Sequence, residues 1–210
     1  MVKITDLQPQ KRNPDRLNVY LDGEFGFGIA RALAPWLQVG GNLEPDQIRK
    51  LQQQDEEEQA YQKSLHYLSY RNRSETEIRR HLEKKELSSS AISAALDRLK
   101  DQSLVDDLSF AQEWVENRNT FRPRGKKALS SELYQKGISR EIIQEVLEDL
   151  DERELAMQLA QKKIERVKDL EQMDFQKKLY GYLSRKGFHY GLCKEIVQEL
   201  WEKQNTELLD

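Results

Sequence analysis

The residues best suited to bind a polyanion form one short run that contains no acidic residue. Residues 118–127 hold five cations, namely Arg118, Arg122, Arg124, Lys126 and Lys127. Pro123 and Gly125 predict a loop that leads into a helix, whose first backbone N–H groups would add to the positive potential. Such a run suits either the phosphates of nucleic acid or an acidic groove on a protein.

Cations recur near two comparable positions of the chain. Arg71 and Arg73 come earlier, Lys162 and Lys163 come later, and Arg185 with Lys186 follow near the end. The chain has 34 lysine and arginine residues against 37 acidic ones, so many of these charges are expected to be ordinary solvated pairs. With a net charge of -3, affinity for nucleic acid must come from local clusters. The neighbouring aromatics Tyr70, Phe121 and Phe188 could stack on bases, although core packing is the favoured interpretation.

No residue set with catalytic spacing is found in the sequence. The three histidines lack metal-ligand spacing, and neither a phosphate-binding loop nor a nucleophile elbow is present. Cys193 lies on an apolar stripe and is predicted to be a buried packing residue. Asp106 and Asp107 are predicted to cap a helix that starts near Leu108. The sequence therefore predicts a protein that is not an enzyme and that uses no metal and no cofactor.

Composition favours helices over a compact α/β enzyme. Of the 210 residues, 37% are hydrophobic and 34% are charged, which suits an elongated, curved array of amphipathic helices. A single cysteine indicates a reducing compartment, and the sequence shows neither a signal-peptide pattern nor a long apolar run. We expect a cytoplasmic protein with no membrane association.

The first thirty residues read as a small antiparallel sheet. Apolar residues alternate over 17–21 and 25–29, and Asp22-Gly23 between them predicts a tight hairpin. Val2 and Ile4 predict a third strand, joined through a polar loop over residues 10–15. Residues 30–37 and 45–51 look helical, and the acidic run 55–58 is expected to be a solvated helix face. Residues 1–59 thus form an expected N-terminal sheet with a helical linker.

A repeat of 50 to 51 residues organises the remainder of the chain. Leu82-x-x-Lys85-Glu86 matches Leu133-x-x-Lys136-Gly137 and Leu183-x-x-Lys186-Gly187, and apolar residues recur downstream at helical spacing. Each copy predicts three short helices, over residues 60–105, 106–151 and 152–210. Stacked copies of this kind bury a continuous seam and leave a long binding surface.

Capping residues support the predicted helix ends. Ser74 and Ser139 are placed to cap helix starts, and Gly137 and Gly187 suit a left-handed position after a helix. In the first copy, Glu86 stands at the position that glycine occupies in the other two copies.

Four motifs, in order, resemble those of the regulatory protein RecX family. They are residues 73–82, the double-Asp stretch 104–111, the stretch from Arg122-Pro-Arg-Gly to Ile138, and the closing motif 183–188. The resemblance covers roughly residues 60 to 203.

This resemblance implies a mainly α-helical array of tandem three-helix repeats that lies in the groove of the RecA–DNA filament. There it would inhibit ATP hydrolysis, strand exchange and filament extension, and so regulate homologous recombination, DNA repair and the SOS response. The expected partners are the RecA filament and, weakly, single- and double-stranded DNA, and the expected state is a monomer. The implied contact residues are Arg122, Arg124, Lys126 and Lys127, with Arg71, Arg73, Lys162, Lys163, Arg185 and Lys186 as further candidates.

Two alternatives remain open at this point. A helical-repeat adaptor that binds only proteins would show no salt-dependent DNA binding. About 4 phosphate contacts on a single strand would instead give a slope of about -3 when the logarithm of the DNA-binding constant is plotted against the logarithm of the salt concentration. A metal-dependent nuclease using Asp106 and Asp107 would cleave DNA with Mg²⁺ or Mn²⁺.

Overall fold

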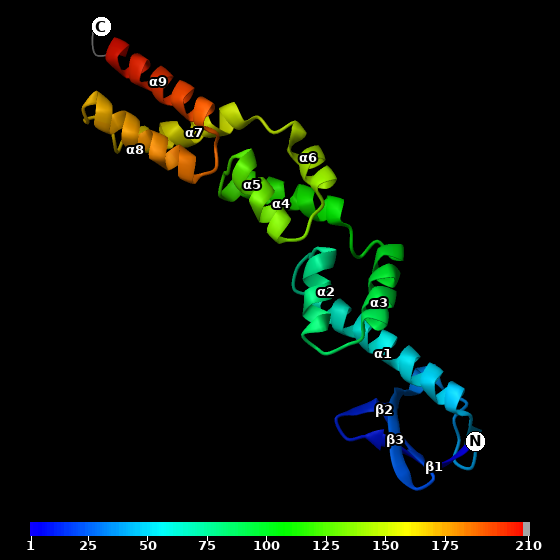
Figure 1. Cartoon of the computed structure of the whole chain (residues 1–210). Helices are drawn as coiled ribbons and strands as arrows, with labels where there is room; N and C mark the ends of the chain where they lie inside the picture. Colours follow the sequence, from blue (N-terminus) through cyan, green and yellow to red (C-terminus); the bar gives the residue numbers. More distant parts are fainter. Residues whose placement is uncertain (208–210) are drawn as a thin grey trace. The chain divides into compact units, whose positions relative to one another are not determined.

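The residues up to Val105 and those from Asp106 onward form two units (Figure 1). Each unit has its own hydrophobic cores. The structure is a computed structural model and describes residues 1–207. We call Met1–Val105 unit 1, and the part that begins at Asp106 unit 2.

The N-terminal sheet has four antiparallel strands in the order β3-β2-β1-β4. The strands are β1 (Val2–Gln10), β2 (Asn13–Leu21), β3 (Glu24–Ala30) and β4 (Asn42–Leu43). The predicted hairpin at Asp22-Gly23 is confirmed, and both residues have positive φ. Two details differ from the prediction. The sheet has a fourth strand, β4, which is too short to show an alternating pattern in the sequence. The loop expected over residues 10–15 is largely taken up by β1 and β2.

The buried face of the sheet packs on the first helix. Ile4, Val19, Ile29 and Leu43 share one core with Leu51 of α1 (Pro45–Leu68). The predicted helix over residues 30–37 is reduced to a single 3-10 turn, η1 (Arg31–Leu33). Pro35 explains this, because its ring nitrogen has no hydrogen to donate to a continuing helix.

In unit 1, the second half of α1 packs with α2 (Glu75–Glu83) and α3 (Ser89–Asp101). The repeat motif supplies the core, since Ile78 and Leu82 of α2 are buried against Ile92, Leu96 and Leu99 of α3. Burying one such leucine stabilises a fold by about 1.5–3 kcal/mol.

Unit 2 contains two further three-helix groups. The first comprises α4 (Asp107–Phe121), α5 (Lys126–Gln135) and α6 (Arg140–Glu148). The second comprises α7 (Glu152–Ile164), α8 (Gln172–Arg185) and α9 (Tyr190–Glu207). The predicted fold class is confirmed: mainly α, with tandem three-helix groups and a small N-terminal sheet. The third copy was predicted to extend to residue 210, and residues 208–210 lie outside the described part.

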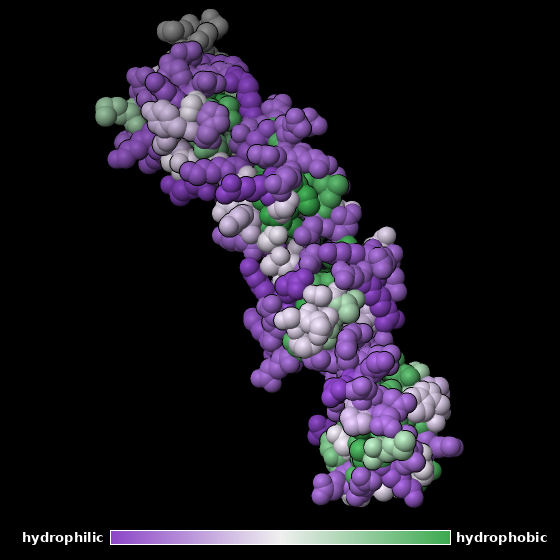
Figure 2. All heavy atoms as spheres, turned by 45° about the vertical axis from the view of Figure 1, so that its right-hand side comes forward, coloured by the Kyte–Doolittle hydropathy of each residue, from purple (hydrophilic) through white to green (hydrophobic). Residues whose placement is uncertain are grey.

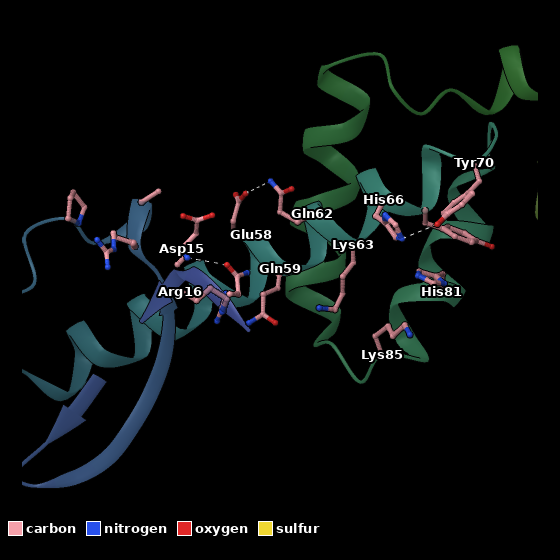
Figure 3. A pocket seen from close by; sticks show the side chains of 16 residues that line it. Asp15, Arg16, Glu58, Gln59, Gln62, Lys63, His66, Tyr70, His81 and Lys85 are labelled. Atoms are coloured by element: carbon pink, nitrogen blue, oxygen red, sulfur yellow. Dashed lines mark hydrogen bonds between the residues drawn. The ribbon is translucent and has the colours of Figure 1, made fainter. Parts of the chain in front are cut away.

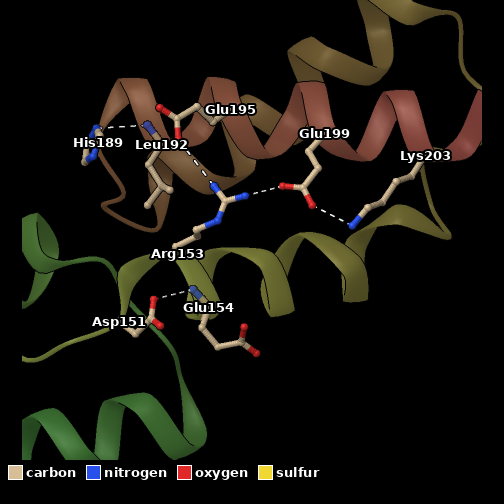
Figure 4. Close-up of polar contacts among 8 residues, drawn as sticks. All are labelled: Asp151, Arg153, Glu154, His189, Leu192, Glu195, Glu199 and Lys203. Atoms are coloured by element: carbon tan, nitrogen blue, oxygen red, sulfur yellow. Dashed lines mark hydrogen bonds and ion pairs between the residues drawn. The ribbon is translucent and has the colours of Figure 1, made fainter.

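The surface is strongly polar, as the composition predicts. In Figure 2, hydrophilic residues cover most of the visible face, and apolar residues show only in limited patches. Many charges are paired between helices: Arg153 of α7 bridges to Glu195 and Glu199 of α9, and Lys203 pairs with Glu199 (Figure 4). Among the residues described, no helix combines the length and the apolarity that crossing a membrane requires.

The acidic run of α1 is not the solvated face that we expected. Asp55 is only 3% exposed and receives two hydrogen bonds from Arg16 of β2, at 2.9 and 2.6 Å. Glu56 accepts from the backbone and hydroxyl of Ser88 at the start of α3, and Glu58 pairs with Arg98. These carboxylates therefore fasten the sheet and α3 to α1.

The predicted caps are present. Ser74 and Ser139 accept hydrogen bonds from the backbone N–H groups of Glu77 and Ile142. Gly137 and Gly187 have φ of 81° and 91°, as their expected left-handed positions require. Glu86 adopts the same conformation with φ of 59°, so a residue with a Cβ occupies a position that favours glycine.

Glu86→Gly is therefore expected to raise the free energy of unfolding of unit 1 by about 0.5–1 kcal/mol. The substitution removes a left-handed penalty of about 1–2 kcal/mol, while the greater freedom of glycine in the unfolded chain offsets part of it. Urea denaturation measures the difference, and an unchanged slope would show that both proteins expose the same surface area on unfolding. A loss of stability would contradict the strain argument.

Candidate functional site

Two loops from different helix groups of unit 2 lie against each other. The backbone N–H of Gly125 donates to the carbonyl of Lys186 at 3.0 Å, and Arg124 Nη1 reaches the carbonyl of Arg185 at 3.5 Å. A Cβ at Gly125 would overlap the backbone of Gly187, and a Cβ at Gly187 would overlap Ala128. The two glycines thus permit the close approach that brings the arginines and lysines of both loops together.

The charges of these loops act on one another. Burial, followed by the positive charges of Arg124 and Arg122, lowers the pKa of Lys186. Lys186 Nζ and Lys163 Nζ lie 5.6 and 5.8 Å from the centre of the Tyr182 ring. Both distances fit cation–π contacts, so Tyr182 brings Lys163 of α7 to the same place.

The lysines and arginines of these two loops, together with Lys163, are called the basic cluster of unit 2. Arg122, Lys127 and Arg185 are exposed, while the others are half-buried. Within residues 1–207, no ion pair neutralises the three exposed members. The cluster comprises Arg122, Arg124, Lys126, Lys127, Lys163, Arg185 and Lys186. Lys162, another predicted contact residue, is exposed at the end of α7, and no observed contact joins it to the cluster.

Acidic residues from elsewhere in unit 2 border this cluster, which the uninterrupted basic run did not predict. Glu132 accepts from Arg118 Nε at 2.7 Å and lies 4.0 Å from Arg124 Nε. Glu152 accepts from the backbone N–H of Lys126 at 2.7 Å, and Lys126 Nζ donates to the carbonyl of Glu148. The expectation that the first N–H groups of α5 add to the positive potential is therefore wrong for Lys126, because a carboxylate already occupies its N–H.

Arg71 and Arg73, the two predicted contact residues of unit 1, each have a partner within the unit. Arg71 forms a two-pronged ion pair with Glu77, at 2.9 and 3.1 Å, so its charge is largely compensated. Arg73 lies over the ring of Tyr67 with its guanidinium carbon 4.0 Å from the ring centre. Among the described residues, the observed contacts bring together cations of the second and third copies, which both lie in unit 2.

The aromatic candidates divide into two kinds. Phe188 is buried in the core of unit 2, as the favoured interpretation holds. Tyr70 and Phe121 are 71% and 73% exposed, so core packing does not account for them. Tyr182 was missed, although its spacing of four residues from Lys186 on a helical stretch was a usable signal.

The remaining chemically reactive residues have structural roles. Asp106 accepts from the Leu108 N–H and from Ser109, and these hydrogen bonds lower its pKa, as expected of a helix cap. Cys193 is buried, and burial raises the pKa of its thiol. Among the described residues, no three His, Cys, Asp or Glu side chains converge as a metal site would need.

Family models match the chain in the order in which the helix groups occur. The model of the regulatory protein RecX N-terminal domain matches residues 2–43. The first, second and third three-helix domains of RecX match residues 60–99, 106–147 and 151–197.

Full-length relatives and solved structures agree with these matches. A regulatory protein RecX from Clostridioides difficile is 33% identical over 202 residues, which cover 94% of this chain and 95% of the relative. One from Clostridium botulinum is 30% identical, with both chains covered completely. A crystal structure of regulatory protein RecX aligns with a TM-score of 0.73 at 28% identity, covering 95% of this chain and all of the other. A RecX structure from Lactobacillus salivarius gives 0.64 at 29% identity, covering 70% of this chain and 97% of the other. With four domain models in order and relatives that match from end to end, this chain belongs to the RecX family of regulatory proteins.

Proposed function

We propose that the chain inhibits a RecA-type recombinase by binding to the recombinase–DNA filament, with the basic cluster of unit 2 as its main contact surface. Relatives named regulatory protein RecX support the target. The observation that carries the choice of surface is the convergence of Arg122, Arg124 and Lys186, which come from two helix groups and share one positive field.

The cluster suits phosphate or carboxylate groups on the filament. Arg122, Lys127 and Arg185 offer charged donors without an internal acidic partner in the part of unit 2 that is described, so a bound anion would not have to displace an existing ion pair. In this proposal the chain catalyses no reaction, needs no cofactor and acts as a monomer in the cytoplasm. It binds single- and double-stranded DNA weakly on its own.

Inhibition requires that the chain prefers one filament state over another. A tenfold shift toward an inactive or non-extending state needs about 1.4 kcal/mol of differential binding. One charge-assisted hydrogen bond made in only one state would supply that amount, at about 1.5–3 kcal/mol. A small number of contacts between the cluster and one filament state is therefore enough for this degree of inhibition.

The deciding experiment titrates the protein into RecA–single-stranded-DNA filaments while ATP hydrolysis and filament length are read together. We expect Arg122→Glu with Lys127→Glu to weaken inhibition by about tenfold or more, because two exposed cations become repulsive. The double variant should also flatten the log–log salt slope of DNA binding by about 1.4, at about 0.7 per lost phosphate contact.

The matched control is Arg140→Glu with Lys194→Glu. Both residues are exposed in unit 2, both lie outside the basic cluster, and the charge change is the same. This control should inhibit like the wild-type protein. An equal loss of inhibition in both variants would show that the effect comes from net charge alone. Full inhibition by the Arg122→Glu, Lys127→Glu variant would show that the cluster is not the contact surface.

A further inference from the structure

Unit 1 contains a broad groove between the N-terminal sheet and the helices of the first repeat. Its volume is about 1190 Å³. The β2 and η1 side contributes Arg16 and Arg31, while α1 and α2 form the opposite end (Figure 3). None of the family motifs quoted above required a groove at this position.

The end formed by the helices gathers cationic and imidazole side chains. Lys63 and His66 come from α1, His81 comes from the last turn of α2, and Lys85 lies in the turn that follows α2. The spacing of three residues places Lys63 and His66 on one face of α1. In Figure 3 these four side chains are seen around the same end of the groove.

The positive charge at this end is not compensated from within unit 1. The two acids that line the groove are Asp15 and Glu58, and Glu58 is already bound to Arg98 at 2.7 Å. In the part of the chain that the structure describes, neither Lys63 nor Lys85 forms an ion pair. A bound anion would therefore meet free positive charge rather than replace an internal partner.

His81 is held in place by stacking. Its ring is parallel to the Tyr67 ring, with 4.0 Å between the centres and an angle of 4°. The guanidinium carbon of Arg73 also lies 4.0 Å from the Tyr67 centre, so it occupies the opposite face of that ring. This three-layer stack fixes the imidazole before any ligand arrives, which lowers the entropy cost of binding.

An exposed aromatic ring accompanies these charges. Tyr70 is 71% exposed, and its hydroxyl is 3.3 Å from Nε2 of His66. Cations that follow a phosphate backbone, next to rings that can stack on bases, are the combination that single-strand binding surfaces use. An acidic peptide would use the lysines and would have less use for a solvent-exposed ring.

We propose that this groove is a second nucleic-acid site, which binds the phosphates of a single strand through Lys63, His66, His81 and Lys85 and stacks a base on Tyr70. The site is separate from the basic cluster of unit 2, and it goes beyond the proposed inhibition of a recombinase. It does not depend on a recombinase being present.

The groove has a pH signature of its own. Burial, and then the charges of Lys85, Arg73, Lys84 and His66, lower the pKa of His81. Lys63 faces it from α1, while Asp15 and Glu58 lie at the other end. A bound phosphate favours the protonated imidazole and raises that pKa, so binding takes up a proton. Affinity therefore rises as the pH falls.

The test measures fluorescence anisotropy of a short labelled oligothymidylate with the full-length protein, at about pH 6 and about pH 8. We expect wild-type binding to be about threefold to tenfold tighter at the lower pH. Lys63→Gln with Lys85→Gln should weaken binding by about tenfold. His81→Gln should reduce the pH response, and His66→Gln with His81→Gln should remove most of it. Lys3→Gln with Lys50→Gln removes the same charge from unit 1 outside the groove and should change little.

Two further arms identify the ligand and separate the two surfaces. Tyr70→Ala should weaken binding to oligothymidylate by at least about fivefold but hardly affect an abasic strand of equal length. The Arg122→Glu, Lys127→Glu variant should keep the pH response even if its inhibition of the recombinase is lost. Equal effects of the groove and control lysine pairs would overturn the proposal, as would competition by polyglutamate as strong as that by oligothymidylate. Neither result would bear on the proposed inhibition of the recombinase, which is tested separately.

Discussion

Asp55→Ala is expected to lower the free energy of unfolding of unit 1 by about 3–5 kcal/mol. The carboxylate accepts four hydrogen bonds, two from Arg16, one from the Ala30 N–H and one from Gln59. Its removal would leave the mostly buried guanidinium of Arg16 and a backbone N–H without their partner. Thermal and urea denaturation measure the loss, and amide hydrogen exchange should rise first in the sheet.

Asp46→Ala is the matched control on the same helix. Asp46 pairs with Arg49, but both side chains are about three-quarters exposed, so the expected loss is below about 1 kcal/mol. The double replacement Arg16→Met with Asp55→Leu should recover much of the stability, because the burial of an unpaired charge is then avoided. Equal losses for Asp55→Ala and Asp46→Ala would show that the buried pair does not hold the sheet.

Gly125→Ala is expected to destabilise unit 2 by about 2 kcal/mol and to impair inhibition of the recombinase. The new Cβ overlaps the Gly187 carbonyl and crowds the Phe188 nitrogen, and both are backbone atoms that cannot rotate away. The hydrogen bond from Gly125 to Lys186 lengthens or breaks as the loops separate. For a unit of roughly 100 residues, this loss corresponds to a decrease in Tm of about 8–16 °C.

The functional effect of Gly125→Ala follows from geometry rather than from charge. All lysines and arginines of the cluster remain, yet Arg122 and Arg124 move away from Lys186, and the shared positive field weakens. Inhibition should be measured well below the variant's Tm, where the chain is folded. Gly181→Ala is the control for stability only, because its Cβ meets the flexible end of Arg185, itself a member of the cluster, and alanine there favours the helix by up to about 1 kcal/mol. Wild-type Tm and full inhibition by Gly125→Ala would contradict the role of the junction.

Each unit thus presents a positively charged surface of different construction. In unit 2 most of the cations come from two loops joined by a backbone hydrogen bond, whereas in unit 1 they come from α1, α2 and the turn that follows α2, beside a sheet. Under the two proposals above, the groove of unit 1 would bind a nucleic-acid strand while the basic cluster of unit 2 binds the recombinase filament. Binding through both surfaces raises the overall affinity when the spacing between their targets allows it.

The repeat, the helix faces and the helix ends could be predicted from the order of the residues. Leu82, Leu133 and Leu183 are all fully buried as the 50-residue spacing predicted, and Ser74 and Ser139 cap as expected. These features are readable because apolar periodicity and capping depend on neighbours within a few residues. The family motifs rest on the same local patterns.

Which charges are neutralised and which remain available depends on contacts between distant parts of the chain. Asp55 looked solvated but pairs with Arg16, 39 residues earlier, and the contact of Arg124 with Arg185 spans 61 residues. The groove of Lys63 and His81 likewise requires α1 and α2 to be packed together. Charged side chains carry no periodic signal of their partners, because an ion pair forms wherever folding brings opposite charges within reach. The availability of a cation is therefore a property of the packed chain and not of its local sequence.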